Sequence, residues 1–184
     1  GADPAEKLRG LHGHGGTDTV MYDREGAGIT VHLHNGTATD GGGSSDTLIA
    51  IENVLASEYG DNITGSDGDN LLDGRGGDDT LSGRSGDDLI YGRGGDDTLI
   101  GGAGNDQLRG GDGTDTISYA MDSSGINAYL SYGLVYDGFG TRDVVLDYEI
   151  LRGSAHDDFV RGTTDDNTFY GGRSEEHTSE LQSL

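Results

Sequence analysis

The apolar residues in the middle of the chain recur with a period of nine. Between Gly65 and Ser118, each nine-residue block has a leucine or isoleucine at its eighth position. These residues are Leu72, Leu81, Ile90, Leu99, Leu108 and Ile117. One apolar position in a short segment is typical of a brief strand with a single inward-facing side chain. The pattern therefore predicts a series of short strands, each of which buries one aliphatic residue.

Glycine and acidic residues keep the same phase as the apolar positions. All six blocks have glycine at positions one and four, and position six is aspartate in five blocks and asparagine in the first. Glycine permits the positive φ angles of tight turns and leaves backbone carbonyl groups accessible. Each block is therefore predicted to form a glycine-rich turn that ends in a carboxylate and leads into a three-residue strand.

The flanking regions carry a weaker form of the same periodicity. Residues 28–33 alternate apolar and polar side chains, as a half-buried strand does, and residues 47–55 continue the apolar spacing. A shift of 97 residues aligns Asp46 with Asp143 and Glu52 with Glu149. We therefore divide the chain into degenerate repeats and spacer strands (1–64), six regular repeats (65–118), and a second spacer with degenerate repeats (119–172). Each spacer is expected either to continue the coils more widely or to form a small separate β element.

The composition makes folding difficult without help. The 184 residues carry a formal net charge of −23, and only 31% of them are hydrophobic. Such a chain normally stays disordered, because it buries too little apolar surface to offset the loss of backbone entropy. Repulsion among 34 acidic side chains also opposes a compact state. A folded form therefore requires an additional source of stability.

Several classes of protein are excluded or disfavoured by the same composition. The chain has no cysteine, so it can form neither disulfides nor thiolate metal sites. It contains no apolar stretch of about 18 residues, so no membrane span is expected. The strong negative charge disfavours nucleic acid as a partner, since phosphate binding requires a basic surface.

The repeated block resembles the RTX, or haemolysin-type, calcium-binding nonapeptide G-G-x-G-x-D-x-U-x, in which U is apolar. The resemblance implies an all-β fold, a parallel β-roll or β-solenoid, in which two blocks complete one coil and residue i stacks on residue i+18. One edge of the roll would then carry Asn70, Asp88 and Asp106, and the other edge Asp61, Asp79, Asp97 and Asp115. Position two departs from the consensus, with serine or arginine in the first four blocks. This departure should matter little if its side chain faces solvent.

The resemblance also implies that these turns bind calcium ions (Ca2+). Calcium takes about six to eight oxygen ligands and accepts both carboxylates and backbone carbonyls. The predicted side-chain ligands are Asp61, Asn70, Asp79, Asp88, Asp97, Asp106 and Asp115. The candidate carbonyl ligands belong to Gly74, Gly77, Gly83, Gly86, Gly92, Gly95, Gly101 and Gly104. We expect up to about five ions in the regular segment, a weaker site at Asn70, and folding that depends on calcium.

Family members commonly leave Gram-negative bacteria through type I secretion, so the resemblance implies an extracellular, secreted protein. An effector domain would then lie elsewhere in a longer chain. The alternatives are a repeat-array adhesin or surface protein, or the non-catalytic part of a secreted hydrolase or toxin. The sequence contains neither an H-E-x-x-H nor a G-x-S-x-G motif, and no catalytic residues are predicted. A solvated acidic linker is disfavoured by the strict nine-residue phase.

The last residues do not follow the repeat. The segment 173–183 reads RSEEHTSELQS and interrupts the period just after Gly171 and Gly172 begin a new block. This string resembles the translation of a common sequencing adapter. Residues 173–184 are therefore interpreted as a non-native tail and left out of the fold prediction; a natural acidic tail is the alternative.

Overall fold

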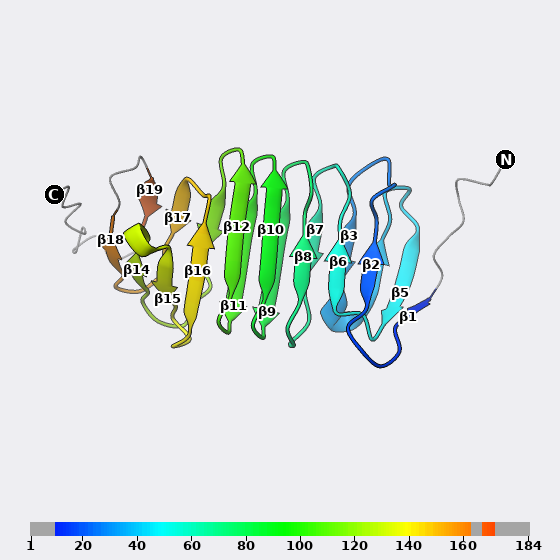
Figure 1. Cartoon of the computed structure of the whole chain (residues 1–184), viewed down its shortest axis with the longest axis horizontal. Coiled ribbons are helices and arrows are strands. Elements are labelled where there is room, and N and C mark those ends of the chain that lie inside the picture. The colour runs from blue at the N-terminus through cyan, green and yellow to red at the C-terminus, as the bar shows by residue number, and fades with distance from the viewer. Residues whose placement is uncertain (1–9, 163–166, 172–184) are drawn as a thin grey trace.

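The computed structural model describes residues 10–162 and 167–171. The tail predicted to be non-native, residues 173–184, lies outside this part of the chain. Within the described residues, the strands form two sheets that lie against each other along one elongated body (Figure 1). The helical segments there are too short and too polar to cross a bilayer.

The larger sheet has ten strands in the described part of the chain. Their spatial order is β1 (Leu11–His12), β5 (Ser45–Ile49), β4 (Thr37–Thr39), β3 (Thr30–His32), β7 (Asn62–Thr64), β9 (Thr80–Ser85), β11 (Thr98–Ala103), β13 (Thr116–Ser118), β17 (Ile150–Arg152) and β19 (Thr168–Tyr170). The smaller sheet has nine described strands. Their order is β18 (Phe159–Arg161), β14 (Asn127–Tyr129), β15 (Leu134–Tyr136), β16 (Arg142–Leu146), β12 (Gln107–Asp112), β10 (Leu89–Gly94), β8 (Leu71–Asp73), β6 (Asn53–Leu55) and β2 (Thr19–Met21).

The regular segment forms the predicted parallel β-roll. Successive blocks alternate between the two sheets, so Leu72 pairs with Ile90 and Ile90 with Leu108, each 18 residues further along the chain. The apolar residue of every regular block is at most 1% exposed. Each strand therefore contributes one aliphatic side chain to a narrow core between the sheets, and the all-β fold class is confirmed.

The two spacers stay within the sheets but reverse direction. In the first, β3 pairs with β7 in parallel, and the chain then returns through antiparallel β4 to β5, which pairs with β1 in parallel. A 3-10 turn, η1 (Leu33–Asn35), links β3 to β4 and ends at Gly36, whose φ of 69° favours glycine. We call β3–β5 the first meander. The spacer is thus not a separate element: it widens one coil of the roll, because Val20 of β2 pairs with Val54 of β6, 34 residues further along the chain.

The second spacer repeats this topology 97 residues later. The second meander consists of β14, η2 (Leu130–Tyr132), β15 and β16, and each element begins 97 residues after its counterpart in the first. It lies in the nine-stranded sheet, whereas the first meander lies in the ten-stranded sheet. The internal repeat detected in the sequence is therefore also a repeat of structure.

Candidate metal centre

The position-six residues stack along the roll and are joined by hydrogen bonds. The backbone N–H of Asp79 donates to Oδ1 of Asp97 at 2.8 Å, and that of Asp97 donates to Oδ1 of Asp115 at 2.9 Å. On the other edge, Asp88 donates in the same way to Oδ1 of Asp106 at 2.8 Å. These bonds join residues 18 positions apart and form what we call the acid ladder. The structure thus places the predicted site residues in the two rows expected from the sequence.

Five of these aspartates keep one carboxylate oxygen without a partner. Oδ2 is buried and accepts no hydrogen bond in Asp79, Asp88, Asp97, Asp106 and Asp115. Each of these residues is at most 2% exposed. A buried carboxylate oxygen without a donor is costly unless a cation or a proton satisfies it. We call these five turns the open turns.

Two other predicted ligands already have their oxygen atoms occupied. The N–H and hydroxyl groups of Ser57 both donate to Asp61, the N–H to Oδ2 at 2.8 Å and the hydroxyl to Oδ1 at 2.8 Å. The N–H of Ser66 donates to Oδ1 of Asn70 at 2.7 Å, and the Asn70 amide nitrogen donates to the carbonyl of Glu52. We call these two the closed turns. Their geometry leaves no acid oxygen in need of a cation.

Position two decides between the two kinds of turn. In the open turns this position has a positive φ angle and is occupied by Arg75, Arg84, Arg93, Gly102 or Gly111. Ser57 and Ser66 are not among the described residues with positive φ. A non-glycine residue in this region costs about 1–2 kcal/mol, so three arginines there are an unusual arrangement. The condition that position two faces solvent is therefore not met by the serines: the Ser57 hydroxyl group donates to Asp61 and that of Ser66 to the amide oxygen of Asn70.

Position-one and position-four glycines are required because other atoms occupy the space of a side chain. A methyl group added at Gly92 would overlap Oδ2 of Asp97, and one added at Gly104 would overlap the carbonyl oxygen of Gly86. Both sets of candidate carbonyls thus belong to the tightly stacked turns that hold the unpartnered carboxylate oxygens. The candidate carbonyls belong to Gly74, Gly83, Gly92 and Gly101 at position one, and to Gly77, Gly86, Gly95 and Gly104 at position four.

Burial and mutual repulsion favour the neutral form of the open-turn aspartates. Burial raises the pKa of Asp79 to about 8 and that of Asp88 to about 7. The pKa values of Asp97 and Asp106 rise to about 6 for the same main reason. Neighbouring carboxylates add to the increase, since like charges disfavour ionisation. A cation bound beside these oxygens would offset both the cost of burying the ionised carboxylates and the repulsion between them.

The acid ladder continues beyond the predicted residues to Asp143 in the second meander and to Glu149, which follows it. The N–H of Asp106 donates to Oδ1 of Asp143 at 3.0 Å, and the N–H of Asp115 donates to Oε2 of Glu149 at 2.8 Å. The Tyr119 hydroxyl group donates to the other oxygen of Asp143 at 2.9 Å, so this position has no unpartnered oxygen. The nine-residue period does not predict Asp143 and Glu149 as members of the ladder. The alignment of the chain with itself at a shift of 97 residues does match them to Asp46 and Glu52.

The degenerate repeat 153–161 is intermediate between the two kinds of turn. The Ser154 hydroxyl group donates to Oδ1 of Asp158 at 2.7 Å, as in a closed turn. Oδ2 of Asp158 is nevertheless buried without a partner. His156 replaces the position-four glycine in this repeat.

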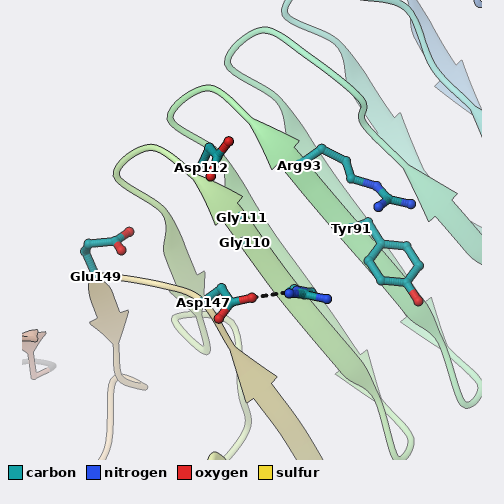
Figure 2. A pocket seen from close by; sticks show the side chains of 8 residues that line it. Tyr91, Arg93, Gly110, Gly111, Asp112, Asp147 and Glu149 are labelled. Carbon is teal, nitrogen blue, oxygen red and sulfur yellow. Dashed lines mark hydrogen bonds and ion pairs between the residues drawn. The ribbon is translucent and has the colours of Figure 1, made fainter. Parts of the chain in front are cut away.

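A shallow depression of about 500 Å³ lies on the outer face of the nine-stranded sheet, next to the turn that follows β12 (Figure 2). Arg109 forms an ion pair with Asp147 at 2.6 Å, as the dashed line in Figure 2 marks. Arg93 pairs with Asp73 at 2.8 Å and lies over the ring of Tyr91. The arginines of this depression are thus already neutralised by acids of the same sheet.

The donor set of the open turns fits a hard cation that accepts backbone oxygens. Within residues 10–162 and 167–171, no three His, Cys, Asp or Glu side chains lie close enough together to hold a metal ion. A cation in an open turn would therefore need carbonyl ligands as well as the carboxylate. Calcium accepts such mixed oxygen ligands, whereas zinc prefers three or four nitrogen, sulfur or carboxylate ligands.

Comparison with known families identifies the repeat. The family model described as RTX calcium-binding nonapeptide repeat (4 copies) matches residues 55–90, 91–120 and 149–175. Together these segments make up about half of the chain and include all five open turns. A comparison with curated proteins found no significant match.

Proposed function

The chain belongs to the RTX calcium-binding nonapeptide repeat family, whose members bind calcium ions, and from this we propose that its five open turns are its calcium sites. The observation that supports the assignment is the unpartnered buried oxygen in Asp79, Asp88, Asp97, Asp106 and Asp115. A bound calcium ion would supply positive charge to these oxygens and would link neighbouring coils.

We propose that the remaining ligands are turn carbonyls. The candidates are the carbonyl groups of Gly74, Gly77, Gly83, Gly86, Gly92, Gly95, Gly101 and Gly104. Asp61 and Asn70 were also predicted to be ligands. We propose instead that they are held by Ser57 and Ser66 and contribute little to calcium binding, because their oxygens already accept hydrogen bonds.

We further propose that the open-turn segment folds when it binds calcium. Each coil buries only two aliphatic residues, and its carboxylates repel one another across a short distance. Metal binding that occurs only in the folded state adds its free energy directly to folding. Because the chain has little apolar surface to bury, we propose that the free energy of calcium binding determines whether the central coils fold.

In this proposal the roll is a non-catalytic folding module of a larger secreted bacterial protein. RTX repeat proteins are typically secreted by type I systems, and such modules typically serve a structural role. An unfolded, acidic roll in a calcium-poor cytosol would be competent for export and would fold outside the cell. The partner of the module would then be an effector domain of the same chain.

Two measurements test the proposal on the 184-residue chain. Isothermal titration should give about five calcium ions bound per chain, and far-UV circular dichroism should show β structure appearing as calcium replaces chelator. A magnesium titration serves as the control, since magnesium demands stricter octahedral geometry. Absence of calcium binding would contradict the site assignment. A complete β spectrum in excess chelator would contradict only the coupling to folding.

A further inference from the structure

The two meanders share their topology but differ in what they present to solvent. In the first meander and the adjoining β7, most outward-facing side chains are small and polar or histidine: Thr30, His32, Thr37, Thr39, Ser45, Thr47, Asn62 and Thr64. In the second meander and the adjoining β18 they are Asn127, Tyr129, Leu134, Tyr136, Arg142, Val144, Leu146, Phe159 and Arg161. Because the first meander forms the same strands without aromatic residues, the fold itself does not require them.

Three aromatic rings form a continuous patch on this face. The ring centroids of Tyr129 and Tyr136 are 6.1 Å apart, and those of Tyr129 and Phe159 are 5.8 Å apart. Tyr136 is 44% exposed and Phe159 is 51% exposed. The rings come from β15, β14 and β18, which are adjacent strands at the C-terminal end of the roll (Figure 1). An exposed aromatic cluster on a rigid sheet is characteristic of a binding surface.

Two arginines without acidic partners lie at opposite sides of the patch. Arg142 of β16 is in register with Tyr136 of β15, and Arg161 of β18 is in register with Tyr129 of β14. Both are exposed, and neither forms an ion pair within the described part of the chain. In this part of the chain Arg24 and Arg152 also lack ion pairs, whereas Arg75, Arg84, Arg93 and Arg109 are paired with acids. Free guanidinium groups are notable in a chain with 34 acidic side chains.

We propose that this outer face of β14, β15, β16 and β18 binds a polysaccharide whose sugars carry carboxylate groups. The C–H faces of pyranose rings stack on exposed tyrosine and phenylalanine rings, and Arg142 and Arg161 pair with carboxylates. Asn127, which lies between Tyr136 and Phe159 in the register, offers hydrogen bonds to hydroxyl groups.

The spacing of charges favours this ligand over a nucleic acid. Arg142 and Arg161 lie three strand spacings apart, on the order of 15 Å. Two cations at that separation fit carboxylates on non-adjacent sugars, whereas nucleic acids carry a phosphate about every 3.4 Å per strand and need a denser basic surface. The inference does not depend on the proposed calcium sites.

Calorimetry on the calcium-saturated chain tests the proposal. The probe is a hexamer of galacturonic acid, and the uncharged comparator is maltohexaose, both at a fixed free calcium concentration because uronates chelate calcium. We expect the acidic hexamer to bind and maltohexaose to bind at least about ten-fold more weakly, since it lacks the carboxylates. Absence of binding, or equal binding of the two sugars, would overturn the proposal.

Variants locate the surface. Tyr129→Ser with Tyr136→Ser, and separately Arg142→Gln with Arg161→Gln, should each weaken binding at least about ten-fold. The matched control is His32→Ser with Thr39→Ser, at the equivalent positions of the first meander, and should leave affinity unchanged. The arginine variants change only exposed side chains, so they remain informative if the tyrosine variant does not fold. Unchanged binding in the arginine variants, or equal weakening in the control, would contradict the assigned surface.

Discussion

The closed and open turns follow the same nine-residue period but satisfy their position-six side chains in different ways. In the closed turns, Ser57 and Ser66 supply hydrogen-bond donors from position two. In the open turns, position two adopts positive φ and supplies none, so one carboxylate oxygen is left for another partner. The residue at position two therefore distinguishes the two closed turns, whose oxygens accept hydrogen bonds, from the five open turns, which we propose bind a cation. This difference leads to four predictions.

The largest expected effect is that of pH on the calcium-free protein, because several open-turn carboxyl groups act together. Their folded-state pKa values of about 6 to 8 lie above the value of about 3.9 expected for an unfolded aspartate. The folded state therefore binds more protons, and its stability is highest below about pH 4 and falls as pH rises through 6 to 8. Each such proton contributes about 1.4 kcal/mol per pH unit.

Far-UV circular dichroism in excess chelator between pH 5 and pH 8.5 measures this dependence as the fraction of β structure that forms without calcium. With saturating calcium the trend should reverse, since acid competes with the metal for the carboxylates. Calcium-free stability that rises between pH 6 and pH 8 would contradict the difference between the turns.

The next largest effect is expected from removing one open-turn carboxylate. Asp97→Asn keeps an acceptor for the Asp79 N–H but removes the charge beside the turn. We expect fewer calcium ions per chain and a midpoint of calcium-induced folding at least about ten-fold higher in concentration. Asp61→Asn in a closed turn is the matched control and should leave calcium stoichiometry unchanged. Equal losses in the two variants would remove the functional distinction between the turns.

A closed turn should become an open one through two substitutions. Ser66→Gly removes the hydroxyl group and permits positive φ, and Asn70→Asp restores the carboxylate. The double variant should bind one additional calcium ion, as counted by titration under saturating conditions. Asn70→Asp alone serves as the control, because Ser66 would still donate to the new carboxylate. An unchanged ion count in the double variant would mean that position two does not govern binding.

The smallest effect is expected at the end of the acid ladder. Tyr119→Phe leaves Oδ2 of Asp143 without its donor and should lower the free energy of unfolding by about 1 kcal/mol. Tyr148→Phe, which removes a hydroxyl group from a half-buried ring in the same region, should have little effect. Thermal unfolding of both variants in calcium provides the measurement. A larger loss for Tyr148→Phe would exclude the hydrogen bond as the cause.

The sequence predicted the regular coils well because their contacts repeat with the chain. A nine-residue phase determines which residue faces inward, and a coil of two blocks determines that Ile90 stacks on Leu72 and Leu108. The sequence also identified the acids of both edges. These features depend only on alternation and local turn chemistry, which can be read without knowledge of distant contacts.

Two features could not be predicted in this way. The reversal of β4 and β15 depends on pairing between strands whose order in space differs from their order in the chain. The partners of the acids depend on the φ angle of position two and on distant contacts such as that of Tyr119 with Asp143. A period indicates where an acid lies, but it does not indicate which donor reaches it.

The stacking of each coil on its immediate neighbours gives assembly a direction. In a quasi-one-dimensional stack, order spreads from a seed to the adjacent unit. The closed turns around Ser57 and Ser66 immediately precede the first open turn in the chain. Under the proposed coupling of folding to calcium, they would form first and serve as a template for the open-turn coils, an order that hydrogen exchange at limiting calcium would reveal.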